Sequence, residues 1–190
     1  MKKRYKLEGS QEIMKKDSIA LIGFMATGKT AVGKALLEKL GKKYRFIETD
    51  QIIIEEAGKS IPEIFKQDGE IRFREYEIEA CKKASKFTNA IISCGGGVVL
   101  NKINIDYLKQ NCHVVLLEAS AEEIYERAMR DGKEMRPIID KEDPKAEIEK
   151  VLKFRKPFYE SAAELIITTT NKSIKDIIEE IIQKTGIRKS

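Results

Sequence analysis

The sequence predicts a single domain of the α/β class, in which a five-stranded parallel sheet is flanked by helices. Three observations lead to this prediction. The chain has 190 residues, of which 42% are hydrophobic, and this is ample for one core but leaves no room for a second domain. Short apolar runs alternate with amphipathic helical patterns, which is typical of a parallel sheet. A glycine-containing segment joins the first apolar run to the first helical pattern.

The alternating runs give each element its approximate bounds. The first helical pattern places Val32, Leu36 and Leu40 on one stripe, as expected for a helix that packs on a sheet. We expect strands at residues 19–23, 44–47, 90–94, 113–118 and 164–168. We expect helices at residues 30–40, 61–65, 73–81, 103–110, 121–129, 147–159 and 174–183. Residues 1–17 are expected to form a polar extension and residues 18–190 the domain.

Charge and cysteine content argue against several classes of protein. The net charge is +5, but acidic and basic residues alternate, whereas nucleic-acid binders concentrate basic residues on one face. No apolar run approaches the ~20 residues that a membrane span needs. Cys81, Cys94 and Cys112 are far apart and form no C-x-x-C pair, which favours a reducing compartment. We expect a cytoplasmic monomer that binds neither nucleic acid nor membrane.

Residues 23–30, Gly-Phe-Met-Ala-Thr-Gly-Lys-Thr, match the pattern G-x-x-x-x-G-K-[ST] in full. An apolar strand precedes the match and a helix follows it, which is the context that a P-loop requires. The backbone N–H groups of such a loop converge on phosphate oxygens, and the residues that supply them are Gly23, Ala26, Thr27 and Gly28. Lys29 can bridge the β- and γ-phosphates, and the Thr30 hydroxyl can hold Mg²⁺. The sequence therefore predicts a P-loop NTPase fold that binds ATP and Mg²⁺.

A regulatory GTPase is the main alternative from a different class of protein. That class needs D-x-x-G, which does not occur in this chain, and N-K-x-D, which residues 171–174 begin but end with Ile174. An ATPase that acts on nucleic acid would need a further domain, for which the chain is too short. These features favour phosphoryl transfer to a small molecule and leave a nucleotide-binding regulator as a distant alternative.

From Ile19 to about Asn171 the chain resembles the shikimate kinase family. The segments that carry the resemblance occur in the family's order: residues 23–30, 48–51, 69–74 with Glu77, 93–97, 136–138 and 155–159. The resemblance implies a fold like that of nucleoside monophosphate kinases. It also implies transfer of phosphate from ATP to the 3-hydroxyl group of shikimate, a step in chorismate and aromatic amino acid biosynthesis. A related kinase for gluconate or another sugar acid is the alternative.

The resemblance also implies roles for the residues that would meet the acceptor. Asp50 matches the aspartate that binds the acceptor hydroxyl and serves as the base, although it could also cap a helix N-terminus. Arg74 and Arg155 match the arginines that grip the carboxylate of shikimate, where two parallel hydrogen bonds can form. The turn at Gly95, Gly96 and Gly97 matches the family's contact with the shikimate hydroxyl groups.

The remaining matches concern the metal and the phosphates. Glu48 and Ser93 match residues near the Mg²⁺ ion, but the family usually has Asp where this chain has Glu48. Residues 131–143 match a mobile lid, in which Arg136 would reach the phosphates, with Arg130 at its base. Asn171 aligns with the adenine side of the nucleotide site. Ala26 stands where the family usually has Gly, so we expect a negative φ at that position.

Overall fold

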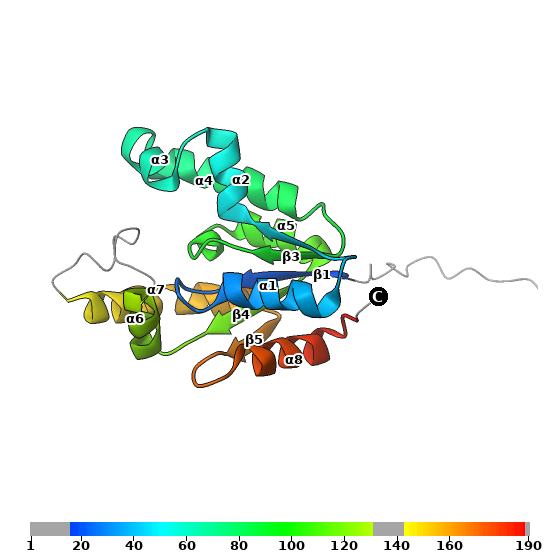
Figure 1. Ribbon diagram of the computed structural model, residues 1–190. Coiled ribbons are helices and arrows are strands. Elements are labelled where there is room, and N and C mark those ends of the chain that lie inside the picture. Colours follow the sequence, from blue (N-terminus) through cyan, green and yellow to red (C-terminus); the bar gives the residue numbers. More distant parts are fainter. Residues whose placement is uncertain (1–15, 131–142, 189–190) are drawn as a thin grey trace, which may run out of the picture.

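The computed structural model describes residues 16–130 and 143–188, which form one parallel sheet with helices on both faces (Figure 1). The strands lie in the order β2-β3-β1-β4-β5 and all pair in parallel. Their bounds are β1 Ser18–Ile22, β2 Arg45–Glu48, β3 Ala90–Ser93, β4 Cys112–Glu118 and β5 Leu165–Thr168. The predicted fold class is confirmed, and each strand begins and ends within two residues of its expected bounds.

The helices extend beyond their predicted bounds. For α2, the sequence suggested only that a helix could begin at Asp50. The helices are α1 Lys29–Leu40, α2 Thr49–Ala57, α3 Ile61–Gln67, α4 Gly69–Ala84, α5 Lys102–Asn111, α6 Ala121–Arg130, α7 Pro144–Ala162 and α8 Ile174–Thr185, with a 3-10 turn at Val98–Leu100. The start of α3 is fixed by a capping box, because the Glu63 carboxylate accepts hydrogen bonds from both the Ser60 hydroxyl and the Ser60 backbone N–H.

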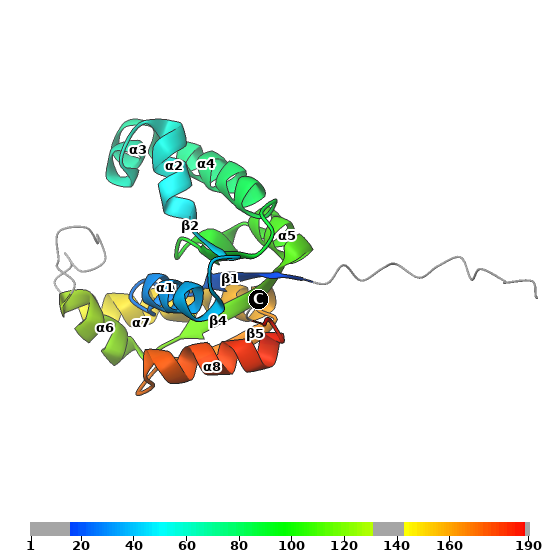
Figure 2. The same cartoon turned by 45° about the vertical axis from the view of Figure 1, so that its right-hand side comes forward.

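The core consists of apolar layers on the two faces of the sheet. On one face, β1, β4 and β5 pack against α1 and α8, for example through Leu21, Leu36 and Ile181. On the other face, strand residues such as Ile92 and Leu116 pack against α4, α5, α6 and α7. A smaller cluster joins α2, α3 and α4, which stand together on the β2 side of the molecule (Figure 2). This arrangement leaves the carboxyl ends of the strands, where α/β proteins bind ligands, between two groups of helices.

The last two residues of the expected polar extension contact the domain. The Asp17 carboxylate accepts hydrogen bonds from the Ser18 hydroxyl at 2.8 Å and the Asn89 N–H at 3.1 Å, and Lys16 pairs with Glu164. Residues 1–15 lie outside the described part of the chain. None of the described helices is long and apolar enough to cross a membrane.

Gly33 allows α1 to approach strand β2 closely. A Cβ atom at Gly33 would lie 2.4 Å from Cε2 of the Phe46 ring, closer than real contacts permit. In a helix interior Ala is normally better than Gly by about 1 kcal/mol, so the clash and the helix propensity act in opposite directions at this position. The short distance indicates that the clash dominates.

We therefore predict that Gly33→Ala lowers the free energy of unfolding by about 1–3 kcal/mol, the usual cost of overpacking a core. Urea denaturation of the purified protein measures this change. Adding Phe46→Leu should recover part of the loss by making room for the methyl group. A Gly33→Ala variant that is as stable as the parent would show that α1 is not held against Phe46.

Candidate active site

The predicted P-loop connects β1 to α1, and its backbone oxygens accept hydrogen bonds from the lysine of the same loop. Lys29 Nζ donates hydrogen bonds to the backbone oxygens of Gly23 at 2.9 Å and Phe24 at 2.7 Å. The Thr27 hydroxyl donates to the same Phe24 oxygen at 2.9 Å. Gly28 caps α1 with φ = 93°, a conformation that favours glycine. The ammonium group of Lys29 is therefore held over the loop at the positive end of a helix, where a phosphate group would sit.

Ala26 contradicts the expectation of a negative φ, because its φ is 57°. A left-handed backbone costs a residue with a Cβ atom roughly 1–2 kcal/mol. Arg127 Nη1 donates to the Ala26 backbone oxygen at 3.4 Å, a contact that helps to hold this conformation. The loop thus keeps a backbone conformation that a glycine would adopt easily, and contacts with the surrounding structure compensate for the free-energy cost at Ala26.

A cavity of about 620 Å³ opens beside the P-loop. Its walls combine the loop and α1 with residues from α6, α8 and the β5–α8 connection. Five cationic side chains line it: Lys29, Lys34, Arg127, Arg130 and Lys172. A pocket with this size and charge suits a nucleotide, whose phosphates are anionic.

Arg127 and Lys172 are lining residues of this cavity that the sequence reasoning missed. Arg127 donates to the backbone oxygen and the hydroxyl of Thr169, both at 3.2 Å, and pairs with Glu123. In the sequence, Glu123 and Arg127 look like an ordinary i,i+4 surface pair, so no local signal marks Arg127. Arg130 also lines the cavity, and Thr169 and Lys172 line it on either side of Asn171. The roles of Arg130 and Asn171 stay predictions.

Two of the three predicted metal-binding side chains are in direct contact. The Thr30 hydroxyl donates to Glu48 Oε1 at 2.8 Å, so the longer side chain of Glu still reaches the P-loop. Ser93 of β3 is in register with Glu48 of β2, which sets the two side by side at the strand ends. Within residues 16–130 and 143–188, no group of three or more His, Cys, Asp or Glu side chains could hold a metal. The side chains of Thr30, Glu48 and Ser93 offer oxygen atoms and one carboxylate, which fits Mg²⁺, an ion that usually keeps several waters and binds one or two carboxylates together with substrate phosphates.

The glycine turn at Gly95–Gly97 lies against three of the predicted acceptor-binding residues. A Cβ atom at Gly95 would lie 2.8 Å from Asp50 Oδ1, and one at Gly97 would lie 2.7 Å from Arg74 Nη1. The backbone oxygen of Gly96 accepts hydrogen bonds from Arg155 Nη1 at 3.1 Å. Asp50, Arg74 and Arg155, which come from α2, α4 and α7, thus meet around one turn.

The Arg74 guanidinium is fixed by two carboxylates of its own helix. It pairs with Glu77 at 3.0 Å and with Glu70 at 3.0 Å. The Glu77 side chain is only 2% exposed, and it also accepts a hydrogen bond from Asn104 Nδ2 at 3.2 Å. Burial raises the pKa of the Glu77 carboxyl, while the positive charge of Arg74 opposes that rise. Arg74 is therefore held in one orientation by a buried network.

Arg155 is held differently. Its guanidinium lies 5.7 Å from the centroid of the Phe24 ring, close enough for a cation–π contact. Its Nε atom is buried and has no hydrogen-bond partner among the described residues. A buried N–H group without a partner is costly, so a bound water or ligand that accepted its hydrogen bond would stabilise the site.

Tyr159 is a further residue of the site that the sequence reasoning did not assign. It lies one helical turn after Arg155, and its hydroxyl donates to the Gly96 oxygen at 2.6 Å. Burial raises the pKa of Tyr159 to about 12, with Arg155 opposing, so the phenol stays protonated and remains a donor. In the sequence it is one more aromatic residue on a helix that packs on the core.

Asp50 is the second residue of α2 and does not cap it, which corrects one reading of the sequence. The N-cap position belongs to Glu48, and no side chain caps this helix end. The surface of Asp50 is exposed to solvent, yet protein groups crowd its carboxylate from one side. Loss of hydration raises the pKa of Asp50, Lys29 opposes this rise, and Glu48 adds to it. Arg136 and nearly all of the predicted lid lie outside the described residues.

The raised pKa of Asp50 has a consequence for stability. A carboxyl group whose pKa is higher in the folded state destabilises that state when it is charged. We predict that Asp50→Asn increases the free energy of unfolding at pH 7. The gain should shrink as the pH falls through the folded-state pKa, and it should vanish below the unfolded-state value of about 3.8.

Chemical denaturation of both proteins between pH 3 and pH 8 tests this prediction. Asp106→Asn is the matched control, because Asp106 is an exposed carboxylate that pairs with Lys102 and should give no gain at pH 7. If Asp50→Asn is less stable than the parent, or if the difference does not change with pH, Asp50 is not under electrostatic strain.

Comparisons with known proteins agree with this geometry. A shikimate kinase from Enterococcus faecalis is 42% identical over 168 residues, which cover 88% of this chain and 98% of that protein. The solved structure of a shikimate kinase from Acinetobacter baumannii in complex with shikimate matches with a TM-score of 0.81 and 32% identity, covering 89% of this chain and 92% of that one. A gluconokinase from Sinorhizobium meliloti matches with a TM-score of 0.56 and 14% identity, which shows the fold alone.

The family model for shikimate kinase matches residues 25–185, from the P-loop to the last helix. This span includes every described residue assigned above to the two sides of the site except Gly23 and Phe24. The chain therefore belongs to the shikimate kinase family.

Proposed function

We propose that this chain transfers the γ-phosphate of ATP to the 3-hydroxyl group of shikimate, giving shikimate 3-phosphate and ADP. Membership of the family makes it a kinase that uses ATP with Mg²⁺ and phosphorylates shikimate. The observation that carries the proposal is the glycine turn around which Asp50, Arg74 and Arg155 meet. One carboxylate and two guanidinium groups suit a small acceptor that carries both a hydroxyl group and a carboxylate.

On the nucleotide side, Lys29 and the backbone N–H groups of the P-loop would bind the phosphates. Arg127 and Arg130 add positive charge to the wall of the same cavity. Thr30, Glu48 and Ser93 would hold Mg²⁺, which neutralises negative charge on the phosphates when it is bound. Arg136 is proposed to reach the transferred phosphate from the lid, as the resemblance implied.

On the acceptor side, Arg155 would donate from Nε and Nη to the acceptor carboxylate, and Arg74 would donate from the neighbouring position. Asp50 would then orient the attacking hydroxyl group and accept its proton. Phosphoryl transfer depends mainly on position and on charge stabilisation, so a carboxylate, here with its pKa raised by burial, suffices as the base. Tyr159 is a positioning residue, because it acts through the Gly96 oxygen.

We also propose a cytoplasmic, monomeric enzyme. Cys81, Cys94 and Cys112 are buried and free, which supports a reducing compartment.

The acceptor assignment predicts a clear order of substrates. Shikimate should be phosphorylated well, and shikimate methyl ester poorly, because the ester cannot pair with Arg74 and Arg155. Gluconate should also be poor, since an open chain does not present its carboxylate and hydroxyl groups in the geometry of the ring. A coupled assay of ADP release with each compound measures this order. Equal rates with the acid and the ester would refute the proposal that Arg74 and Arg155 bind the acceptor carboxylate. A preference for gluconate would instead assign the chain the activity of a sugar-acid kinase.

We predict that Arg155→Ala raises KM for shikimate by about thirtyfold to several thousandfold, the usual effect of leaving a buried charge without its partner. The change should appear in KM more than in kcat, because the carboxylate is remote from the reacting atoms. KM for ATP should change little. Steady-state kinetics with each substrate varied in turn measure both constants.

Two further variants make the Arg155 experiment specific. Lys150→Ala removes an exposed cation from the same helix and should leave both KM values unchanged. Asp50→Asn should lower kcat by about 10²-fold or more while shikimate still binds, because it removes the base and keeps both arginines. A large loss of kcat with normal KM in Arg155→Ala would assign this residue to the chemical step instead.

A further inference from the structure

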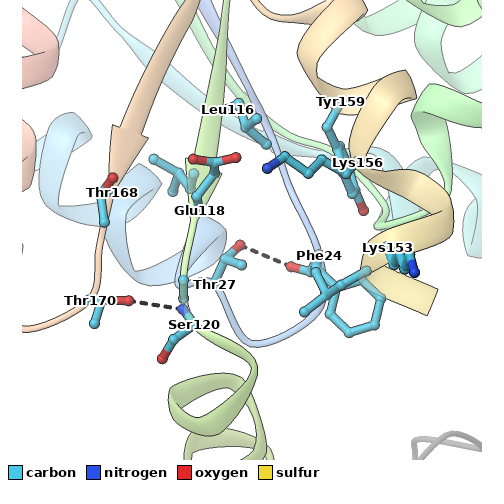
Figure 3. A pocket seen from close by; sticks show the side chains of 13 residues that line it. Phe24, Thr27, Leu116, Glu118, Ser120, Lys153, Lys156, Tyr159, Thr168 and Thr170 are labelled. Carbon is cyan, nitrogen blue, oxygen red and sulfur yellow. Dashed lines mark hydrogen bonds between the residues drawn. The ribbon is translucent and has the colours of Figure 1, made fainter. Parts of the chain in front are cut away.

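A second cavity, of about 500 Å³, lies at the carboxyl ends of β4 and β5 under helix α7 (Figure 3). Its lining residues are Phe24, Thr27, Leu116, Leu117, Glu118, Ala119, Ser120, Leu152, Lys153, Lys156, Tyr159, Thr168 and Thr170. Among these, only Thr27 also lines the nucleotide cavity. The cavity is therefore a separate space that the proposed reaction does not use, and its size is within the usual range for small-molecule sites, about 300–1,000 Å³.

The walls of this cavity are apolar and partly aromatic. Phe24 and Tyr159 contribute aromatic side chains to the lining, and Leu116 and Leu152 contribute branched apolar ones. Burying an apolar ring against such walls is favourable, and offset or edge-to-face aromatic contacts add to it. The apolar part of a ligand would therefore be a ring or a large branched chain.

Two opposite charges face each other across the same space. Glu118 extends from the end of β4 and Lys156 extends from α7 towards it (Figure 3). In the described part of the chain, the Glu118 carboxylate makes no hydrogen bond or ion pair. Lys156 has only a long, exposed contact with Glu160 at 3.7 Å. A ligand with an ammonium group and a carboxylate would pair with both side chains, whereas a simple acid or amine would leave one of them unpaired.

We propose that this cavity binds a small zwitterion with an apolar ring, the chemistry of an α-amino acid with a large apolar side chain. The ammonium group pairs with Glu118, the carboxylate pairs with Lys156, and the ring lies against Phe24 and Tyr159. The size, the apolar walls and the charge pair each limit the ligand independently, and this class satisfies all three.

The same walls connect the cavity to the reaction site. The Tyr159 ring lines the cavity while its hydroxyl holds the Gly96 oxygen at 2.6 Å. Phe24 also lines the cavity, its ring lies beside Arg155, and its backbone oxygen accepts the Lys29 hydrogen bond. A ligand that shifts either ring therefore changes the acceptor side of the site. This effect on catalysis rests on the proposed function, whereas binding to the cavity does not.

Calorimetric titration of the full chain with three matched probes tests the binding. L-phenylalanine carries both charges, 3-phenylpropanoate lacks the ammonium group, and 2-phenylethylamine lacks the carboxylate. We expect L-phenylalanine to bind at least about tenfold more tightly than either of the others, since each missing charge leaves one side chain unpaired. Glu118→Gln should remove the advantage over 3-phenylpropanoate, and Lys156→Gln the advantage over 2-phenylethylamine.

Leu152→Trp fills the cavity and should abolish binding of all three probes, provided that its unfolding temperature stays near that of the parent. If this variant is poorly folded, Ala119→Leu serves as the second filling variant. Absence of binding to the parent, equal binding of the three probes, or displacement of L-phenylalanine by a non-hydrolysable ATP analogue would each overturn the proposal.

Kinetics separate the two parts of the inference. L-phenylalanine should change KM for shikimate severalfold in the parent and not in Leu152→Trp. Binding with no change in KM would refute the connection through Tyr159 and Phe24 and leave the site intact. If shikimate is not the acceptor, the measurement of KM for shikimate will fail. The calorimetric titration will still decide whether the cavity binds the zwitterion.

Discussion

The acceptor side of the site depends on the absence of side chains at Gly95 and Gly97. Neither glycine has a positive φ, so the backbone conformation itself does not require glycine there. A Cβ atom at either position would lie within 2.8 Å of the end of the Asp50 or Arg74 side chain, so it would push that functional group away from the turn. The turn lets one carboxylate and one guanidinium approach the same stretch of backbone, whose Gly96 oxygen then fixes Arg155 and Tyr159. Four side chains from three helices are thus positioned by a segment that has no side chain of its own.

In the P-loop, by contrast, a residue that has a Cβ atom adopts a backbone conformation that favours glycine. Ala26 has a φ of 57°, where glycine would be the easier choice, and the loop nevertheless keeps its shape. Lys29, Thr27 and Arg127 all bond to backbone oxygens of this loop, and these contacts compensate a local cost of roughly 1–2 kcal/mol. The loop therefore tolerates a residue with a Cβ atom, whereas a Cβ atom at Gly95 or Gly97 would displace the Asp50 or Arg74 group that the turn accommodates.

The parts of the structure that are encoded locally could be predicted from the sequence. The five strands and the P-loop depend on runs of neighbouring residues, and their periodicity is visible without a structure. Contacts between distant segments could not be derived in this way, and the grouping of Asp50, Arg74 and Arg155 was expected only from the resemblance to a family. Arg127 was found by neither route, because it resembles a member of a surface ion pair. Tyr159 lies in the matched segment 155–159 but received no role, because it resembles a core aromatic residue. Their roles depend on Thr169 and Gly96, which are far from them in the sequence.

Arg74 and Arg155, the two arginines proposed to bind the acceptor carboxylate, are not equivalent, because their surroundings differ. The charge of Arg74 is already balanced by Glu70 and by the buried Glu77, so this side chain contributes orientation more than net positive charge. Removing it would also leave the Glu77 carboxylate buried without its partner, which typically costs about 3–5 kcal/mol of stability. Arg155 has no carboxylate partner among the described residues, and its Nε is buried and unpaired. If the two arginines bind the acceptor as proposed, the net charge that attracts its carboxylate would come mainly from Arg155. Arg74, fixed by its own helix, would set where that carboxylate can lie.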